Sequence, residues 1–219
     1  MGKVNPSGKL TMTWPIAATD HPSTQDFPGN IDSYTFRMMA ANKMPIPGHS
    51  YTNHNEDIYV GYRYFDTFNR EVAYPFGFGL SYTTFAFSKP TVKANAGLVS
   101  VSVTVKNTGS VTGKEVAQVY VTAPQGKMEK PAQELKAFAK TRELKPGESQ
   151  TLTMTIPVRD LASFDEEGSQ WLTEAGNYTF RIGSSSRDIA VTTMLKLAEY
   201  TEKTTNALAP QGGLNLLKQ

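Results

Sequence analysis

The sequence predicts a mainly β protein whose larger part is a β-sandwich of the immunoglobulin or fibronectin type III kind. Short segments between residues 83 and 191 alternate apolar and polar residues, turn-forming residues separate them, and no long helical pattern interrupts them. Alternation is typical of strands that bury one face, and several such strands in series favour a sandwich. We place this sandwich at residues 81–193.

Composition and charge indicate a globular chain without general affinity for polyanions. Of its 219 residues, 39% are hydrophobic, which is enough for a sizeable core. Lys and Arg total 22, Asp and Glu total 20, and the net charge is +2. We therefore expect neither nucleic acid nor an anionic membrane as a partner.

Several features are absent from the sequence. It has no cysteine, which excludes disulfides, thiolate zinc sites and cysteine nucleophiles. Its apolar runs are too short for a membrane-spanning helix. Residues 1–6 are polar and lack the apolar core of a signal peptide. These absences leave the compartment unassigned.

A single strand is predicted ahead of the sandwich, at residues 9–14. This segment alternates apolar and polar residues and stops at Pro15, and the turn-forming residues 5–8 precede it. No second strand pattern lies nearby, so the strand has no obvious partner in the chain. We expect it to belong to a larger structure.

Residues 20–57 are irregular and rich in proline. A short helix is predicted within them from four apolar residues at helical spacing: Ile31, Tyr34, Met38 and Met39. Asn30 is suited to cap this helix. Packing against a neighbouring element is favoured over a sugar or cofactor platform for this stripe.

Two aromatic segments complete the region before the sandwich. Residues 58–65 are dense in aromatic and β-branched residues, which predicts a strand. Residues 75–82 interleave glycine with aromatic residues. Since only glycine lets a backbone approach another surface closely, we expect residues 75–82 to run over a packed surface at Gly77 and Gly79.

Seven short strands are predicted for the sandwich. They cover residues 83–90, 99–105, 115–123, 133–140, 152–156, 178–182 and 189–191. Residues 133–140 are the least regular, because the large Phe138 lies on the face opposite three apolar residues, Leu135, Ala137 and Ala139.

Two further features lie at the end of the sandwich. Tyr178 follows the turn residues 175–177 and is placed to form a tyrosine corner, which ties a loop to the sandwich. Residues 194–219 lose the strand period, so we expect a loosely attached tail with at most one short helix.

The carboxylates ahead of the sandwich do not form a predicted catalytic pair. They are Asp20, Asp26, Asp32, Glu56, Asp57, Asp66 and Glu71. Glycoside hydrolysis requires two carboxyl groups that flank one bond, roughly 5–9.5 Å apart. The adjacent Glu56 and Asp57 point to opposite faces of an extended chain. We interpret the set as surface carboxylates and keep Glu56 as an open candidate, because it lies just ahead of an aromatic segment.

No metal or cofactor site is predicted. A metal site at His49 and His54 is a minor alternative, since no cysteine or metal-binding helix motif accompanies them, and His21 is remote in sequence. A glycine-rich phosphate loop is lacking too. Residues 165–167 are interpreted as a solvated acidic turn. The residues alone therefore assign no catalytic, cofactor-binding or metal-binding role.

A set of short motifs follows one another along the chain. Ahead of the sandwich they are residues 5–10 (NPSGKL), 58–66 (IYVGYRYFD) and 74–85 (YPFGFGLSYTTF). Within it they are residues 105–109 (VKNTG), 113–121 (GKEVAQVYV), 176–178 (GNY) and 183–189 (GSSSRDI). Together they resemble the C-terminal portion of glycoside hydrolase family three, the β-glucosidase and β-xylosidase group, with its fibronectin type III-like domain. The resemblance covers residues 2–193, and is poor at residues 20–57 and in the tail.

The resemblance implies a larger enzyme. Members of the family carry an (α/β)8-type barrel, an α/β sandwich domain and then the fibronectin type III-like domain. They act with retention, using an Asp nucleophile and commonly a Glu acid/base. Both residues lie upstream of the motif at residues 5–10, so the resemblance transfers no catalytic residue to this sequence. It gives no active-site role to Glu56, Tyr62 or Arg63 either.

The resemblance also divides the chain. Residues 1–14 would be the last strand of a truncated α/β sandwich domain and residues 15–80 a connecting strap. Residues 81–193 would be the fibronectin type III-like domain and residues 194–219 a tail.

Two functions are compatible with these observations. In the first, the chain is a non-catalytic piece of a retaining β-glycosidase that stabilises or docks onto the catalytic domains. In the second, it is an independent binding or adhesion module. The first is favoured, because an independent module does not need the segments before residue 81. The expected partners are the barrel and α/β sandwich domains, in the same or another chain, or a second copy. A bacterial periplasmic or secreted location is compatible with the full-length enzyme.

Overall fold

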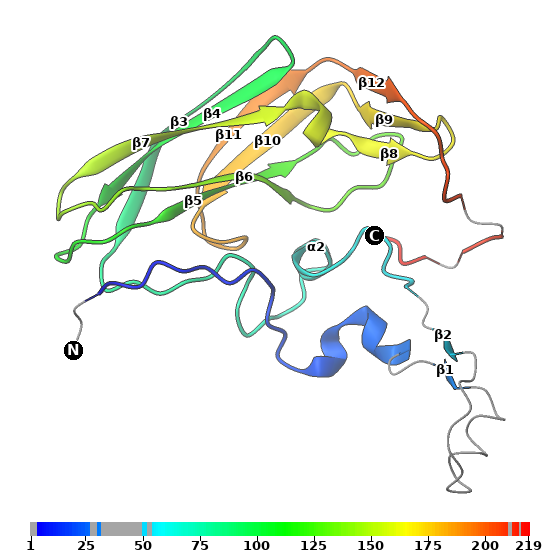
Figure 1. Cartoon of the computed structure of the whole chain (residues 1–219), viewed down its shortest axis with the longest axis horizontal. Helices are drawn as coiled ribbons and strands as arrows, with labels where there is room; N and C mark the ends of the chain where they lie inside the picture. The colour runs from blue at the N-terminus through cyan, green and yellow to red at the C-terminus, as the bar shows by residue number, and fades with distance from the viewer. Residues whose placement is uncertain (1–3, 27–29, 32–49, 52–53, 210–211, 215) are drawn as a thin grey trace, which may run out of the picture.

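Two antiparallel sheets packed face to face form the sandwich (Figure 1). The computed structural model describes residues 4–26, 30–31, 50–51, 54–209, 212–214 and 216–219. One sheet has the strand order β3-β4-β7 and the other the order β11-β10-β5-β6. The strands are β3 (Phe85–Asn95), β4 (Leu98–Asn107), β5 (Val116–Thr122), β6 (Glu134–Lys140), β7 (Ser149–Pro157), β10 (Gly176–Gly183) and β11 (Ile189–Leu197). Each of the seven predicted strands is present, and the predicted fold class is confirmed.

The core lies between the two sheets and follows from the alternation in the sequence. On β4 four valines are fully buried: Val99, Val101, Val103 and Val105. They form one cluster with Val119, Phe180 and Ile182 of the opposite sheet. Burying each such side chain contributes about 1.5–3 kcal/mol, so this cluster is the main source of the sandwich's stability.

β6 is the edge strand of its sheet, which explains its irregular pattern. Ala137 and Ala139 pack against the core, whereas Phe138 is 69% exposed. The strand predicted at residues 133–140 is therefore confirmed, with its large aromatic residue on the outer face.

A small third sheet was not predicted. It has the order β12-β9-β8 and consists of β8 (Ser163–Asp165), β9 (Gln170–Thr173) and β12 (Tyr200–Lys203). The prediction of a loose tail beginning at residue 194 is wrong, since β11 runs to Leu197 and β12 follows. Thr193 interrupts the inward apolar series of β11, and this hid its continuation through Leu195 and Leu197.

Residues 9–14 do have a partner, contrary to the sequence-based expectation. Leu10 exchanges backbone hydrogen bonds with Phe78 (2.8 Å) and Gly77 (2.9 Å), and the N–H of Trp14 donates to the carbonyl of Tyr74 (2.9 Å). Of residues 9–14, Trp14 alone forms a β-bridge, with Tyr74, so the segment is a paired extended chain rather than a regular strand. The partner was missed because residues 73–78, which include Pro75 and Gly77, carry no strand pattern.

The aromatic segment at residues 58–65 is not a strand. Residues 55–58 form a turn, and helix α2 (Tyr62–Thr67) begins after Gly61, whose φ of 59° starts a new direction of the chain. The aromatic residues suit the helix because Tyr62 and Phe65, three positions apart, lie on one face. Phe65 is completely buried there.

The remaining elements before the sandwich are short. They are the 3-10 helices η1 (Ala18–Asp20) and η2 (Pro22–Asp26) and a strand pair, β1 (Asn30–Ile31) with β2 (Ser50–Tyr51). Asn30 therefore lies in a strand and does not cap a helix, while Tyr34, Met38 and Met39 lie outside the described residues. A further 3-10 helix, η3 (Val158–Leu161), follows β7. Across the described ranges we find no helix with the length and apolarity that a bilayer crossing requires.

Candidate docking surface

An N-terminal layer, formed by residues 4–26 and 54–82, covers the outer face of the β5–β6 sheet (Figure 1). On β5, Ala117, Val119 and Val121 are buried in the core, yet the outward-pointing Gln118 and Tyr120 are also buried, at 3% and 0% exposure. A strand buried on both faces requires a cover on its outer side. The N-terminal layer provides that cover.

Aromatic contacts join the layer to β5. Tyr62 of α2 lies 4.6 Å from Phe76 and 6.0 Å from Tyr120, measured between ring centroids. The Tyr62 hydroxyl accepts a hydrogen bond from the backbone N–H of Leu135 on β6, at 2.8 Å. Burial raises the pKa of Tyr62 and of Tyr120 above the usual value of 10.0, so both phenols stay neutral in this contact.

Gln118 connects three parts of the structure. Its side-chain N–H groups donate to the carbonyls of Gly77 (3.1 Å) and Ser184, and its oxygen accepts from the Tyr120 hydroxyl. Gly77 has a φ of 81°, and a Cβ there would lie 2.0 Å from the Gln118 side chain. A Cβ on Gly79 would lie 2.4 Å from the Gly8 carbonyl. The predicted close approach of the backbone at both glycines is confirmed.

Arg187, in the loop between β10 and β11, holds the end of α2. Its Nε donates to Asp66 at 2.8 Å, and its terminal nitrogen donates to the carbonyls of Phe65 (3.1 Å) and Arg70 (2.6 Å). Asp66 also accepts a hydrogen bond from Gln133, at 3.1 Å. A cation at a helix C-terminus satisfies carbonyls that have no partner within the helix.

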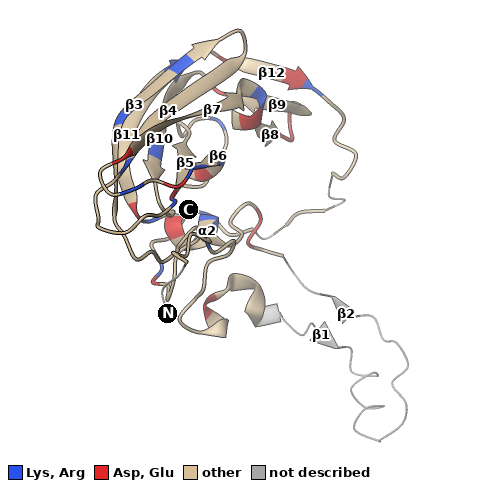
Figure 2. Cartoon of the chain, turned by 60° about the vertical axis from the view of Figure 1, so that its left-hand side comes forward, with Lys and Arg blue, Asp and Glu red and all other residues tan. Residues whose placement is uncertain are grey.

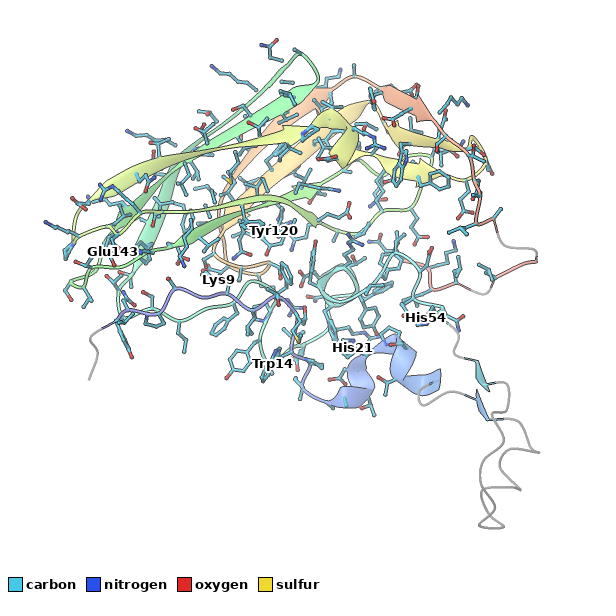
Figure 3. All side chains as sticks on the ribbon, viewed as in Figure 1. Lys9, Trp14, His21, His54, Tyr120 and Glu143 are labelled. Carbon is cyan, nitrogen blue, oxygen red and sulfur yellow. The ribbon has the colours of Figure 1, made fainter. Side chains whose placement is uncertain are left out.

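The first residues of the layer are anchored as well. The Asn5 side chain donates to the carbonyl of Thr112 (3.1 Å) and accepts from the backbone N–H of Tyr82 (2.9 Å). Lys9 forms an ion pair with Glu115 at 2.7 Å, with both side chains largely buried. Figure 3 shows Lys9 and Tyr120 between the layer and the sheet. The motif at residues 5–10 thus attaches the chain to the sandwich.

A third anchor lies at Tyr59, which is buried. Its hydroxyl donates to Glu129 at 2.7 Å, and its ring lies 4.9 Å from Phe68. Burial, together with the bond to Glu129, raises the pKa of Tyr59 well above 10.0. The layer is therefore attached to the sandwich at three places: near its first residues, at Tyr59 and at the end of α2.

The opposite side of the layer is apolar and exposed. We define the docking face by Met12, Trp14, Ile16 and Tyr74, which are 60%, 50%, 64% and 44% exposed. Met12, Trp14 and Ile16 alternate along the chain, and the Thr13 between them is buried against the protein. This arrangement inverts the usual one, because the apolar side chains face solvent and the polar one is covered.

The two chain segments that form the docking face carry no charged side chain, and Asp20, Arg70 and Glu71 lie at its rim, beside Ile16. Residues 10–19 and 72–88 contain no Lys, Arg, Asp or Glu, and the pairing of Trp14 with Tyr74 places these two runs side by side. The Trp14 and Tyr74 rings meet edge to face at 6.2 Å. Figure 2 shows the charged residues mainly on other parts of the ribbon, and Figure 3 shows Trp14 turned away from the sheets. A contiguous exposed apolar patch of this kind marks an interaction site.

The candidates from the sequence lie elsewhere. Glu56 is buried, and His54 approaches one of its oxygens at 3.2 Å, while the other oxygen has no hydrogen-bond partner among the described residues. Asp57 is exposed, so the two neighbours do point apart. His21 lies edge-on to Phe65, and His49 is outside the described residues. In the described part of the chain, no three His, Asp or Glu side chains are grouped to hold a metal.

The acidic turn at residues 165–167 is only partly solvated. Asp165 is buried and accepts hydrogen bonds from Gln170 (3.0 Å), the backbone N–H of Gly168 (3.2 Å) and Lys127 (3.1 Å). These bonds hold the pKa of Asp165 below its usual value. The interpretation as a solvated turn is therefore wrong for Asp165, because a short strand, β8, turns this residue inward.

The tyrosine corner at Tyr178 is confirmed. Its hydroxyl donates to the carbonyl of Glu174, four residues upstream, at 3.0 Å. Burial raises its pKa to about 12. The residues of the docking surface, in contrast, were not singled out from the sequence as one site. The two charge-free runs at residues 10–19 and 72–88 are the signal that identifies it.

Comparisons with known proteins agree with this architecture. Residues 115–186 match the family described as fibronectin type III-like domain. Beta-glucosidase A of Butyrivibrio fibrisolvens and a beta-glucosidase of Ruminococcus albus are each 41% identical to the chain, over 96% of it. The structure of beta-glucosidase 3B from Thermotoga neapolitana in complex with glucose has a TM-score of 0.81 and 47% identity, over 93% of this chain and 26% of that one. The chain spans 26% and 21% of the length of the two curated relatives.

Proposed function

Because the chain belongs to glycoside hydrolase family three and corresponds to the C-terminal part of its β-glucosidases, we propose that it is a non-catalytic docking piece of a retaining β-glycosidase. Its task is to hold the docking face in a fixed position, where the catalytic domains of the enzyme pack against it. These domains are its expected partners, in the same chain or in another.

One observation carries this proposal. The docking face combines exposed Met12, Trp14, Ile16 and Tyr74 with an absence of charge over residues 10–19 and 72–88. Water around such a face is released when a complementary apolar surface covers it, and this release is the main driving force of association. The chain spans about a quarter of the length of beta-glucosidase A. We therefore infer that the rest of such an enzyme supplies the surface that covers the docking face.

The anchors explain how the sandwich contributes. Lys9–Glu115, Arg187–Asp66 and Tyr59–Glu129 tie the layer to three separate loops of the sandwich. A docking face that is already ordered loses little conformational entropy on binding, so more of the interaction energy appears as affinity. The sandwich therefore acts as a rigid support for the face.

Complementation in trans tests the proposal. The part of beta-glucosidase 3B from Thermotoga neapolitana that this chain does not cover would be produced separately and mixed with the chain. We expect a complex by size-exclusion chromatography and a gain in aryl β-glucoside hydrolysis, whereas the chain alone should show none. The reason is that a retaining mechanism needs two carboxyl groups in one site. Hydrolysis by the chain alone that Glu56→Gln abolishes would contradict the non-catalytic role.

Two matched variants locate the contact. Trp14→Asp places a charge in the docking face, and Phe138→Asp places the same charge at an exposed aromatic position on the edge strand β6. We expect the first to abolish the complex and the second to leave it intact. Equal effects of the two variants would reject the docking face as the interface. Failure of the wild-type chain to form any complex would favour the independent binding module.

A further inference from the structure

A groove lies at a different place from the docking face. It is lined by the β8–β9 hairpin, by residues 127–131 and by the start of α2, and the C-terminal residues Leu216 and Lys218 reach it. In Figure 1 the C-terminus lies in this region, between β8 and α2. The volume of the groove is about 1020 Å³. This is at the upper end of the roughly 300–1,000 Å³ that is usual for small-ligand sites, so it has room for more than one sugar ring.

One wall of the groove is aromatic. Phe164 and Trp171 are opposite each other in the β8–β9 pair, and their rings meet at 5.4 Å with an angle of 61° between them. An edge-to-face contact of this kind fixes the orientation of the indole. Trp171 keeps 36% exposure, so part of its ring stays open to a ligand in the groove.

The other wall carries fixed polar groups. Glu134 accepts from Arg63 of α2 at 3.0 Å and from Lys136 at 3.1 Å. Glu134 and Lys136 are two positions apart on β6 and so share a face. The guanidinium of Arg63 has more N–H donors than this ion pair uses, and the remaining ones are available to hydroxyl groups. The three side chains are held in place before a ligand arrives.

Seven acidic and five basic side chains line the groove, and each of the five cations is paired with a carboxylate. Besides the Glu134 pairs, Lys127 is paired with Asp165 (3.1 Å) and Lys218 with Glu129 (3.6 Å). With its cations paired and a small excess of carboxylates, the groove has no strong positive field and disfavours an anionic ligand. It favours a ligand that is uncharged and still rich in hydrogen-bonding groups.

We propose that this groove binds a neutral oligosaccharide. The C–H face of a pyranose ring packs on Trp171, while ring hydroxyls exchange hydrogen bonds with Glu134, Arg63 and Lys136. The class of ligand follows from the groove itself. The choice of β-linked glucose oligomers as probes rests on the proposed function, and Trp14 variants, which disable docking, leave this groove unchanged.

The two tryptophans of the chain give a direct test. In ¹⁵N–¹H spectra of the whole chain, Trp14 and Trp171 each give one indole signal. Titration with cellotetraose and with laminaritetraose should shift the Trp171 signal saturably with at least one of them and leave the Trp14 signal in place. No saturable shift with either probe, or a shift of Trp14 alone, would overturn the proposal.

Variants and a charged probe complete the test. Trp171→Ala should weaken binding at least roughly tenfold, whereas Trp14→Ala should not change it. Glu134→Gln keeps the size of the side chain and should also weaken binding, which covers the case that Trp171→Ala fails to fold. Unchanged affinity in Glu134→Gln and in a folded Trp171→Ala would reject the site. Equal or tighter binding of tetragalacturonate would reject a neutral ligand.

Discussion

Arg187 and Asp66 connect a loop of the sandwich to the end of a helix in the N-terminal layer, with Nε of Arg187 2.8 Å from Oδ1 of Asp66. The same guanidinium donates to the carbonyls of Phe65 and Arg70, which lie at and beyond the last turn of α2. A six-residue helix is not stable on its own. The structure of α2, and the position of the layer, therefore depend on a side chain of the sandwich.

Arg187→Ala should lower the free energy of unfolding by about 2–3 kcal/mol, because it removes charge-assisted hydrogen bonds and leaves the mostly buried Asp66 without its cation. Urea denaturation of the whole chain measures this loss. Hydrogen exchange should show faster opening of residues 62–67, with the sandwich strands affected least.

Arg159→Ala is the matched control. Arg159 pairs with Glu202 at 2.8 Å, but both side chains are more than a third exposed. An exposed pair contributes about 0–1 kcal/mol, so this variant should unfold nearly like the wild type. Similar losses for the two variants would show that Arg187 has no special part in holding the layer.

Phe180→Ala should lower the free energy of unfolding by about 3–5 kcal/mol, because the ring is completely buried between the sheets and its removal leaves a cavity. Thermal and urea unfolding of the whole chain give the value. Phe138→Ala removes the same ring from an exposed position on β6 and should change stability by less than about 0.5 kcal/mol. A loss below about 1 kcal/mol for Phe180→Ala would mean that the face of β10 that carries Phe180 does not point into the core.

The sandwich was predictable because the alternation that marks each of its strands can be read from neighbouring residues. The valines of β4 and the alternating residues of β10 repeat with period two, and a single buried face is enough to produce that pattern. The strand at residues 58–65 was predicted from composition instead, and this failed at α2, because aromatic residues suit either a strand or a helix packed under a cover. Here Gly61 and the contact of Tyr62 with Phe76 and Tyr120 decide for the helix.

The candidate site was harder to predict because it depends on contacts between distant residues. Nothing in residues 9–14 indicates that residues 73–78 are their partner, and Arg187 meets Asp66 across more than a hundred residues. The alternation of Leu10, Met12 and Trp14 is typical of a strand that buries its apolar face. Only the burial of Thr13 shows that this face points outward.

Acid should destabilise the protein in part through Glu174. Burial alone would raise the pKa of this carboxyl, but hydrogen bonds from the Lys130 side chain and the backbone N–H of Lys127 outweigh it and hold the pKa below the usual 4.5. Because the folded-state pKa is lowered, the stabilising contribution is complete above pH 4.5 and is lost as the pH falls through the folded value.

Glu174→Gln should therefore lower stability at pH 7 and flatten the fall of the unfolding free energy below about pH 4.5, as measured by urea denaturation at each pH. Glu143→Gln alters an exposed carboxylate that lies 3.9 Å from Lys114, and it should leave the curve unchanged. A pH profile of Glu174→Gln that runs parallel to that of the wild type would contradict this role of Glu174.

The exposed docking face should make the chain self-associate in a pure sample, where the proposed catalytic partner domains are absent. Met12, Trp14, Ile16 and Tyr74 form an uncharged apolar surface, and a second copy is the only cover available in a pure sample. Light scattering of the whole chain should show an average mass that rises with concentration.

Trp14→Asp should return the chain to a monomer, because burying an unpaired carboxylate is costly. Phe138→Asp should not, since it changes only the edge strand β6. Association that Phe138→Asp abolishes and Trp14→Asp preserves would assign it to pairing of sheet edges, and a strict monomer at all concentrations would show that the face does not bind itself.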